Sequence, residues 1–263
     1  MVDLLRGDAG GWCVLLLLAL GLALAYPTME RANSATAPRP REVRFVHTPE
    51  WIGDSLIEHL GRIATRHIGT DVPTQSQLIN MHTALDQSGW FDTVRQVRRT
   101  AAGDIEIQAV FLNPVAIVTD AHGDVLVDAH ARPLPHGTRM GGDAHHLRIT
   151  NPGQDRPARP RHAWLGDDVA AALRLHAVLS NRDWLDQITS IDLSSFNHDG
   201  SLVLLTSQAR IVWGSPPGEE IPLETLTDRK LMRLDKGFQS TGRIDQHYRG
   251  TLDLRDASHL VTR

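Results

Sequence analysis

One apolar run near the start of the chain, Trp12–Tyr26, constrains the protein more than any other feature of its sequence. The run contains seven leucines and no charged residue. Each leucine favours insertion into a bilayer by roughly 0.3–0.6 kcal/mol, so the seven together supply about 2–4 kcal/mol. We therefore expect the rest of the chain to be delivered across or onto a membrane, which argues against a role in cytosolic metabolism.

Two interpretations of this segment remain open. Counted as Gly10–Met29, it has 20 residues, and a helix of that length spans about 30 Å, the thickness of a bilayer core. The strictly apolar run is shorter, and Ala23–Ala25 is a small-x-small site of the kind that signal peptidase cuts. Flanking charges give no support to an anchor with its N-terminus inside. We predict a tail over 1–11, a transmembrane helix or signal segment over 12–29, and a linker over 30–42.

Composition limits the chemistry of the exported part. The only cysteine, Cys13, lies inside the apolar run, so the remainder has neither disulfides nor thiolates. The net charge is −4, and the basic residues are scattered, without the aromatic interleaving of nucleic-acid-binding surfaces. We predict no nucleic-acid partner, and the length suffices for one large or two small domains.

The hydrophobic pattern over 43–113 predicts a compact α+β unit with two helices on one face of a sheet. Both helices begin with the S/T-x-x-E/Q pattern of a capping box, at Ser55 and Glu58 and at Thr74 and Gln77. In chain order the predicted elements are a strand over Val43–His47, helices from Ser55 and from Thr74 to Gly89, and strands over Val94–Thr100 and Ile105–Leu112.

The pattern over 114–263 predicts a mostly antiparallel β domain with flanking helices. Its predicted elements are a hairpin of Val115–Thr119 with Asp124–Val127, a helix from an Asp167 cap to Ser180, strands over 188–194, 201–206 and 209–213, a helix over 223–235, and one or two strands over 242–262.

Motifs for catalysis, cofactors and metals are missing from the sequence. His145 and His146 are adjacent, so both cannot face one ion without distortion, and no HExxH or cysteine partner accompanies them. Asp167-Asp168 sits where a helix cap and a first-turn acid belong. There is no G-x-S-x-G elbow. We therefore predict no catalytic residue, no cofactor site, no metal site and no enzyme. The tract of Arg156, Arg159 and Arg161 is read as a solvated proline-rich loop in preference to a lipid or glycan site.

Several short phrases, in their order and spacing, resemble the FtsQ/DivIB family of bacterial division proteins. They are Gly89–Val94, Phe111–Ala116, Gly123–Asp128, Arg210–Gly214 and Thr251–Arg255. The resemblance implies a cytoplasmic tail, one membrane helix, an exported POTRA domain over 43–113 and a β domain over 114–263. It departs from the family at Leu112-Asn113, where an acidic-basic pair is usual, and at Asp256, where an aromatic is usual.

The resemblance implies a non-enzymatic scaffold of the septum machinery, anchored in the inner membrane with its C-terminal domains on the periplasmic side. Its partners would be small coiled-coil division proteins like FtsB and FtsL. The closing segment 251–262 is the candidate edge for strand addition, and the candidate partner-binding residues are Leu252, Leu254, Arg255, Asp256 and Leu260.

Other interpretations of the closing segment and of the whole chain stay open. An ordinary edge strand, blunted by charge against aggregation, fits the closing segment equally well. If the segment binds a partner, Leu254→Lys should remove binding and leave the melting temperature unchanged. For the whole chain, the alternatives are a secreted or periplasmic protein with a cleaved signal and a POTRA-type transport or assembly component.

Overall fold

A computed structural model describes residues 42–66, 68, 72–135, 146–256 and 261–262. The predicted tail, membrane or signal segment and linker lie outside these residues. Within the described ranges, no helix combines the length and the apolarity needed to cross a bilayer.

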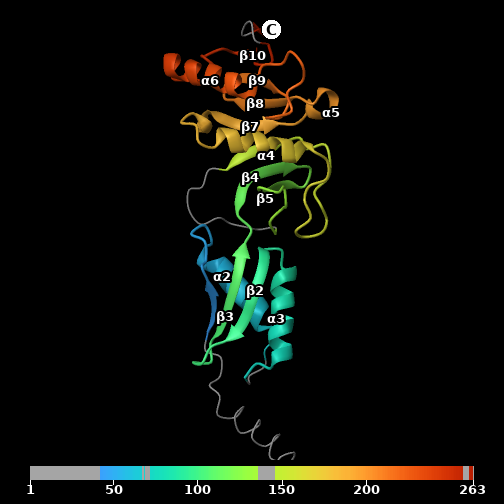
Figure 1. Ribbon diagram of the computed structural model, residues 1–263, viewed down its shortest axis with the longest axis vertical. Coiled ribbons are helices and arrows are strands. Elements are labelled where there is room, and N and C mark those ends of the chain that lie inside the picture. The colour runs from blue at the N-terminus through green and yellow to red at the C-terminus, as the bar shows by residue number, and fades with distance from the viewer. Residues whose placement is uncertain (1–41, 67, 69–71, 136–145, 257–260, 263) are drawn as a thin grey trace, which may run out of the picture.

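The described chain has a mixed α+β fold with five α-helices and two sheets. Figure 1 shows the two sheets one above the other along the long axis, each with helices packed on it. A three-stranded sheet forms from the N-terminal part and an eight-stranded sheet from the C-terminal part. Each sheet has its own cluster of buried apolar residues.

The N-terminal unit has the element order β-α-α-β-β. Its elements are β1 (Val43–Val46), α2 (Asp54–Thr65), α3 (Gln75–Gln87), β2 (Phe91–Arg99) and β3 (Ile105–Phe111). The strand order is β1-β3-β2. The chain reaches β3 from β1 through α2, α3 and β2, and β1 is parallel to β3, whereas the turn after β2 makes β2 antiparallel to β3.

The two predicted capping boxes have different outcomes. Thr74 and Gln77 form a complete box at the start of α3, as predicted. The box at Ser55 and Glu58 is wrong, because the N-cap of α2 lies two residues earlier, at Gly53, which provides no side-chain hydrogen bond. Ser55 therefore lies inside the first turn of α2, where its hydroxyl cannot cap it.

The C-terminal unit is built on a mixed sheet with the order β11-β10-β9-β8-β7-β6-β4-β5. Its elements are β4 (Pro114–Asp120), β5 (Gly123–Asp128), β6 (Leu147–Thr150), α4 (Asp168–Leu179), β7 (Ile188–Asp192), α5 (Phe196–Asp199), β8 (Leu202–Thr206), β9 (Ala209–Gly214), α6 (Thr227–Thr241), β10 (Gly250–Asp253) and β11 (Val261–Thr262).

The prediction of a mostly antiparallel sheet holds for four of its seven adjacent strand pairs. The other three, β4–β6, β6–β7 and β9–β10, are parallel. Parallel neighbours require a crossover, and α4 and α6 provide it for β6–β7 and β9–β10. The sequence predicted both helices but not that they connect parallel strands.

The start of α4 also differs from the sequence prediction. Asp167 occupies the N-cap position but makes no side-chain cap. The neighbouring Asp168, which is buried, accepts hydrogen bonds from the backbone nitrogens of Val169 at 2.8 Å and Gly153 at 2.6 Å. The carboxylate that was assigned a first-turn role therefore fastens the preceding loop to the helix.

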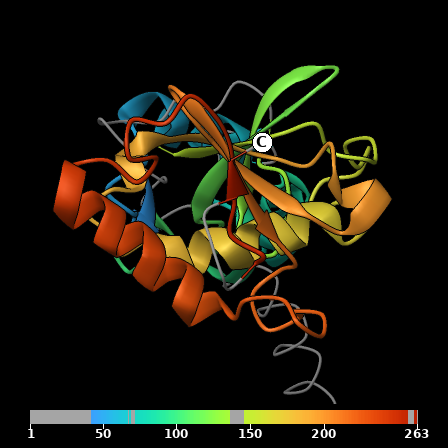
Figure 2. The ribbon, with the colours of Figure 1, turned by 90° about the horizontal axis from the view of Figure 1, so that it is seen from above.

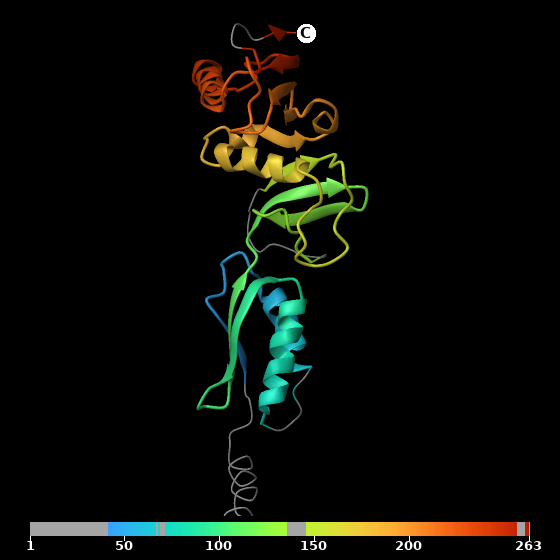
Figure 3. The same ribbon diagram turned by 45° about the vertical axis from the view of Figure 1, so that its right-hand side comes forward.

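The two units are joined by ion pairs as well as by the chain. Arg132, which follows β5, pairs with Asp92 of β2 at 2.7 Å and with the buried Asp128 at 2.7 Å. Arg161, in the loop between β6 and α4, pairs with Asp86 of α3 at 2.8 Å. Figure 3 shows this yellow loop reaching down toward the N-terminal unit. These contacts fix the junction between the two sheets.

We predict that Asp245→Asn makes the stability of the protein less sensitive to acidic pH. Asp245 is buried, and hydrogen bonds from Arg243, with smaller ones from Thr206 and the backbone of His247, outweigh desolvation and lower its pKa to about 2. Because the pKa of the folded state lies below the usual aspartate value of 3.8, this stabilisation is present above pH 3.8 and disappears as the pH falls to 2. The variant should lose about 2 kcal/mol at pH 7 and little below pH 2, measured by urea unfolding. Equal losses at both pH values would contradict the ionic origin.

Candidate protein-interaction site

The predicted partner-binding segment lies at the β11 end of the large sheet, beside α6 (Figure 1). Leu252 is 2% exposed and Leu254 is 1% exposed, and both belong to the core of the C-terminal unit. A partner could therefore reach these two side chains only if the unit opened, and their role in partner binding stays a prediction. Leu260, the third leucine of that set, lies outside the described residues.

Arg255 and Asp256 lie nearer the surface than the two leucines. The Arg255 side chain is 42% exposed and pairs with Asp253 at 2.7 Å and with Asp199 at 3.6 Å. Burial alone would raise the pKa of Asp253, but hydrogen bonds from Arg255 outweigh it and lower that pKa. Asp256 is exposed, and its carbonyl accepts a hydrogen bond from Arg233 at 2.7 Å. Arg255 thus orders the end of β10 and still presents charge at the surface.

The closing segment 251–262, predicted as the candidate edge, contains two strands, β10 and β11. β10 lies between β9, to which it is parallel, and β11, to which it is antiparallel. Within the described residues, the two-residue strand β11 is the outermost strand. Any strand addition at this end would therefore use the backbone of β11, not that of β10.

The loop before α6 presents apolar side chains that sequence reasoning missed. Ile221 is 65% exposed, Leu223 101% and Leu226 62%. In Figure 2 this orange loop projects away from the sheet at the N-terminal end of α6. The predicted helix over 223–235 instead begins at Thr227. Pro222 was the available signal, because its fixed φ favours the second position of a β-turn, which here is closed by the bond from Glu224 to Ile221.

A buried ion pair lies beneath this loop. Lys230 is fully buried, and its ammonium group is 2.6 Å from Glu224 and 5.1 Å from the ring centroid of Trp213. Glu224 also accepts hydrogen bonds from the backbone and hydroxyl of Ser215. Burial alone would raise the pKa of Glu224, but the bonds from Lys230 and Ser215 lower it overall. The carboxylate is therefore ionised at neutral pH, as the geometry of an ion pair requires.

A second exposed edge belongs to β2, the outer strand of the small sheet. Two of its carbonyls are already occupied: that of Asp92 accepts a bond from Arg161 at 2.6 Å, and that of Val94 lies 2.7 Å from the ring of His82. Farther along, Arg95, Gln96, Arg98 and Arg99 are exposed. Along β2, this second half is therefore the more accessible part of the edge.

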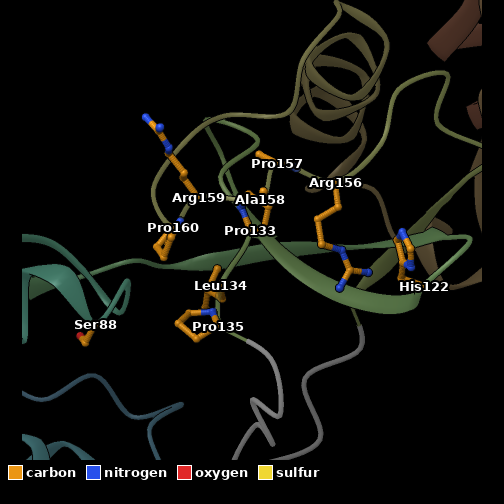
Figure 4. Close-up of a pocket in the computed structure, with 10 residues that line it drawn as sticks. All are labelled: Ser88, His122, Pro133, Leu134, Pro135, Arg156, Pro157, Ala158, Arg159 and Pro160. Atoms are coloured by element: carbon orange, nitrogen blue, oxygen red, sulfur yellow. The ribbon is translucent and has the colours of Figure 1, made fainter.

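The junction carries a cavity of about 290 Å³. Figure 4 shows its lining from the segment after β5 and from the loop over 156–160. The lining residues are Ser88, His122, Pro133, Leu134, Pro135, Arg156, Pro157, Ala158, Arg159 and Pro160. Arg156 is engaged by Asp120 at 2.9 Å, with both side chains almost wholly buried, and the Arg159 side chain extends outward (Figure 4). The sequence predicted that Arg156, Arg159 and Arg161 lie in a solvated loop. Two of them, Arg156 and Arg161, are instead partners in structural ion pairs.

Comparison with models of known protein families finds no match to this chain, and comparison with curated proteins finds no similar sequence. Among the residues that the structure describes, no group of three or more histidine, cysteine, aspartate or glutamate side chains is arranged to hold a metal ion.

Proposed function

We propose that the protein is a membrane-anchored, non-enzymatic scaffold of the bacterial division machinery, with an exported POTRA-like domain and a β domain. The observation that carries the proposal is the β-α-α-β-β unit with β1 parallel to β3, followed by a sheet that has β11 as one of its two outer described strands. This is the order of elements that the resemblance to the FtsQ/DivIB family implies. The partners would be FtsB- and FtsL-like coiled-coil proteins.

In this proposal, binding occurs by strand addition at the β11 edge. Backbone hydrogen bonds supply affinity, and neighbouring side chains select the partner. Since Leu252 and Leu254 are buried, selection falls to surface groups such as Arg255 and Asp256. Arg255→Gln should therefore weaken partner binding and change the free energy of unfolding by less than about 1 kcal/mol, because its ion pairs are partly exposed.

The test is affinity purification of the full chain from gently solubilised membranes, with mass spectrometry of bait and companions. The tag follows Arg263 on a long flexible linker so that it leaves β11 accessible. We expect bait that retains its Trp12–Tyr26 peptide, together with small coiled-coil membrane proteins or septal peptidoglycan synthases. Depletion of the protein should give filamentous cells.

Two other outcomes would replace the proposal. Soluble bait that begins at Tyr26 and carries no companions would indicate a secreted protein with a cleaved signal. Bait that copurifies with an outer-membrane barrel, in cells that divide normally after depletion, would indicate a POTRA-type transport component.

A further inference from the structure

We propose that the turn Ile221–Glu224 is a protein-docking knob, with Leu223 as its tip, for a partner protein that has an apolar pocket with a basic rim. This turn adjoins Arg255, at the end of β10, but it is a different surface from the backbone of β11. The inference does not rest on a role in division.

The backbone of this turn holds Leu223 in an unfavourable conformation. The nitrogen of Glu224 donates to the carbonyl of Ile221 at 3.0 Å, Pro222 occupies the second position and Leu223 has a φ of +75°. This is the arrangement of a type II turn, whose third position is normally glycine. A bulky residue with positive φ is an outlier, and such strain persists only where the surroundings enforce it.

The surroundings do enforce the turn. Glu224 bonds to the nitrogen and hydroxyl of Ser215 at 2.9 and 2.6 Å, to Lys230 at 2.6 Å and to the nitrogen of Ile221 at 3.3 Å. The next residue, Thr225, donates its backbone nitrogen to the carbonyl of Arg255 at 2.8 Å. The tip is thus rigid before a partner arrives, which reduces the entropy lost on binding.

The exposed side chain at the tip adds no packing to the described fold. Leu223 is fully exposed, and Ile221 and Leu226 on either side are mostly exposed. Single exposed apolar residues need no explanation, but a group of them in one projecting segment marks an interaction surface. A strained leucine that contacts nothing contributes no packing to offset its strain.

Charge selects the occupant. The segment 219–228 contains four acidic residues and no basic one. Lys230 neutralises Glu224 and Arg174 pairs with Glu219. Of the remaining charges, Glu220, which also accepts bonds from Thr227, and Asp228 outnumber the exposed Arg229, so the rim of the knob keeps a net charge of −1. A negative rim repels the anionic surface of a bilayer and complements a basic rim on a protein. The occupant is therefore a protein pocket and not lipid.

The first test places a photo-crosslinking amino acid at position 223 of the full chain in its native cells and identifies the joined peptide by mass spectrometry. We expect one protein, crosslinked through a segment whose apolar residues are flanked by lysine or arginine. The control places the crosslinker at Leu165, which is 68% exposed but lies elsewhere. Equal, scattered products from both positions, or products with lipid alone, would overturn the inference.

The second test is Leu223→Gly. Since glycine relieves the positive φ and the leucine packs against nothing, the melting temperature should rise by about 2–4 °C. The complex trapped through a crosslinker at Leu226 should fall at least tenfold. The matched control, Leu165→Gly, should leave the complex intact. A stabilised variant that still forms the full amount of complex would show that Leu223 is merely strained. Loss of septal companions with retention of this complex, or the reverse, separates the knob from the proposed division function.

Discussion

Leu254→Lys is expected to unfold the C-terminal unit of the protein at temperatures where the wild type is folded. Leu254 is 1% exposed, and its backbone nitrogen bonds to the carbonyl of Val212 at 3.0 Å. A lysine there loses the apolar packing and buries an ammonium group without a counter-ion, so the loss should reach at least about 4 kcal/mol. Whole domains are stable by only about 5–15 kcal/mol. Thermal unfolding followed by circular dichroism measures the effect.

The matched control is Leu223→Lys, the same substitution at a fully exposed leucine. It should change the free energy of unfolding by less than about 0.5 kcal/mol. A Leu254→Lys protein that melts with the wild type would contradict the burial of Leu254. From the sequence, Leu254→Lys was expected to leave the melting temperature unchanged. The burial of Leu254 leads to the opposite expectation.

The reason for that reversal is visible in the strand itself. Alternation places Leu252 and Leu254 on one face of the closing segment, and the structure agrees. Alternation cannot say whether that face is covered, because the cover comes from elsewhere in the chain: the same core contains Leu231 and Leu234 of α6. The sequence thus predicted the periodicity of β10 and not its surroundings.

Most elements of the N-terminal unit could be predicted from short-range sequence patterns. The alternation from Ile105 to Phe111 and the capping box at Thr74 depend on neighbours only a few residues away, and both are present. The three parallel pairings of the large sheet depend on crossovers, which local patterns do not record. The exposed turn at Ile221–Glu224 was missed because the helix was predicted to begin at 223, four residues before α6 begins at Thr227.

Glu224→Gln is the second change expected to have a large effect, because it removes the counter-ion of a fully buried lysine. Breaking a buried ion pair from one side destabilises a protein by about 3–5 kcal/mol, and within the described residues Glu224 is the one acid paired with Lys230. Burial already lowers the pKa of Lys230. In the variant, the unfolded state therefore binds a proton more readily than the folded state, so stability should rise as the pH rises toward 10.5. Urea unfolding at a series of pH values measures both effects.

The double variant Glu224→Gln with Lys230→Met tests whether the ion pair mainly holds the Ile221–Glu224 turn in place. Methionine leaves no buried charge, so most of the lost stability should return. The bonds that Glu224 makes to the Ile221–Glu224 turn would still be weakened, and backbone amides there should exchange with deuterium faster than in the wild type. Restored stability with a loosened turn would mean that the ion pair mainly holds the turn in place. Restored stability with unchanged exchange would mean that the turn is rigid without the carboxylate, and the strain at Leu223 would then need another source.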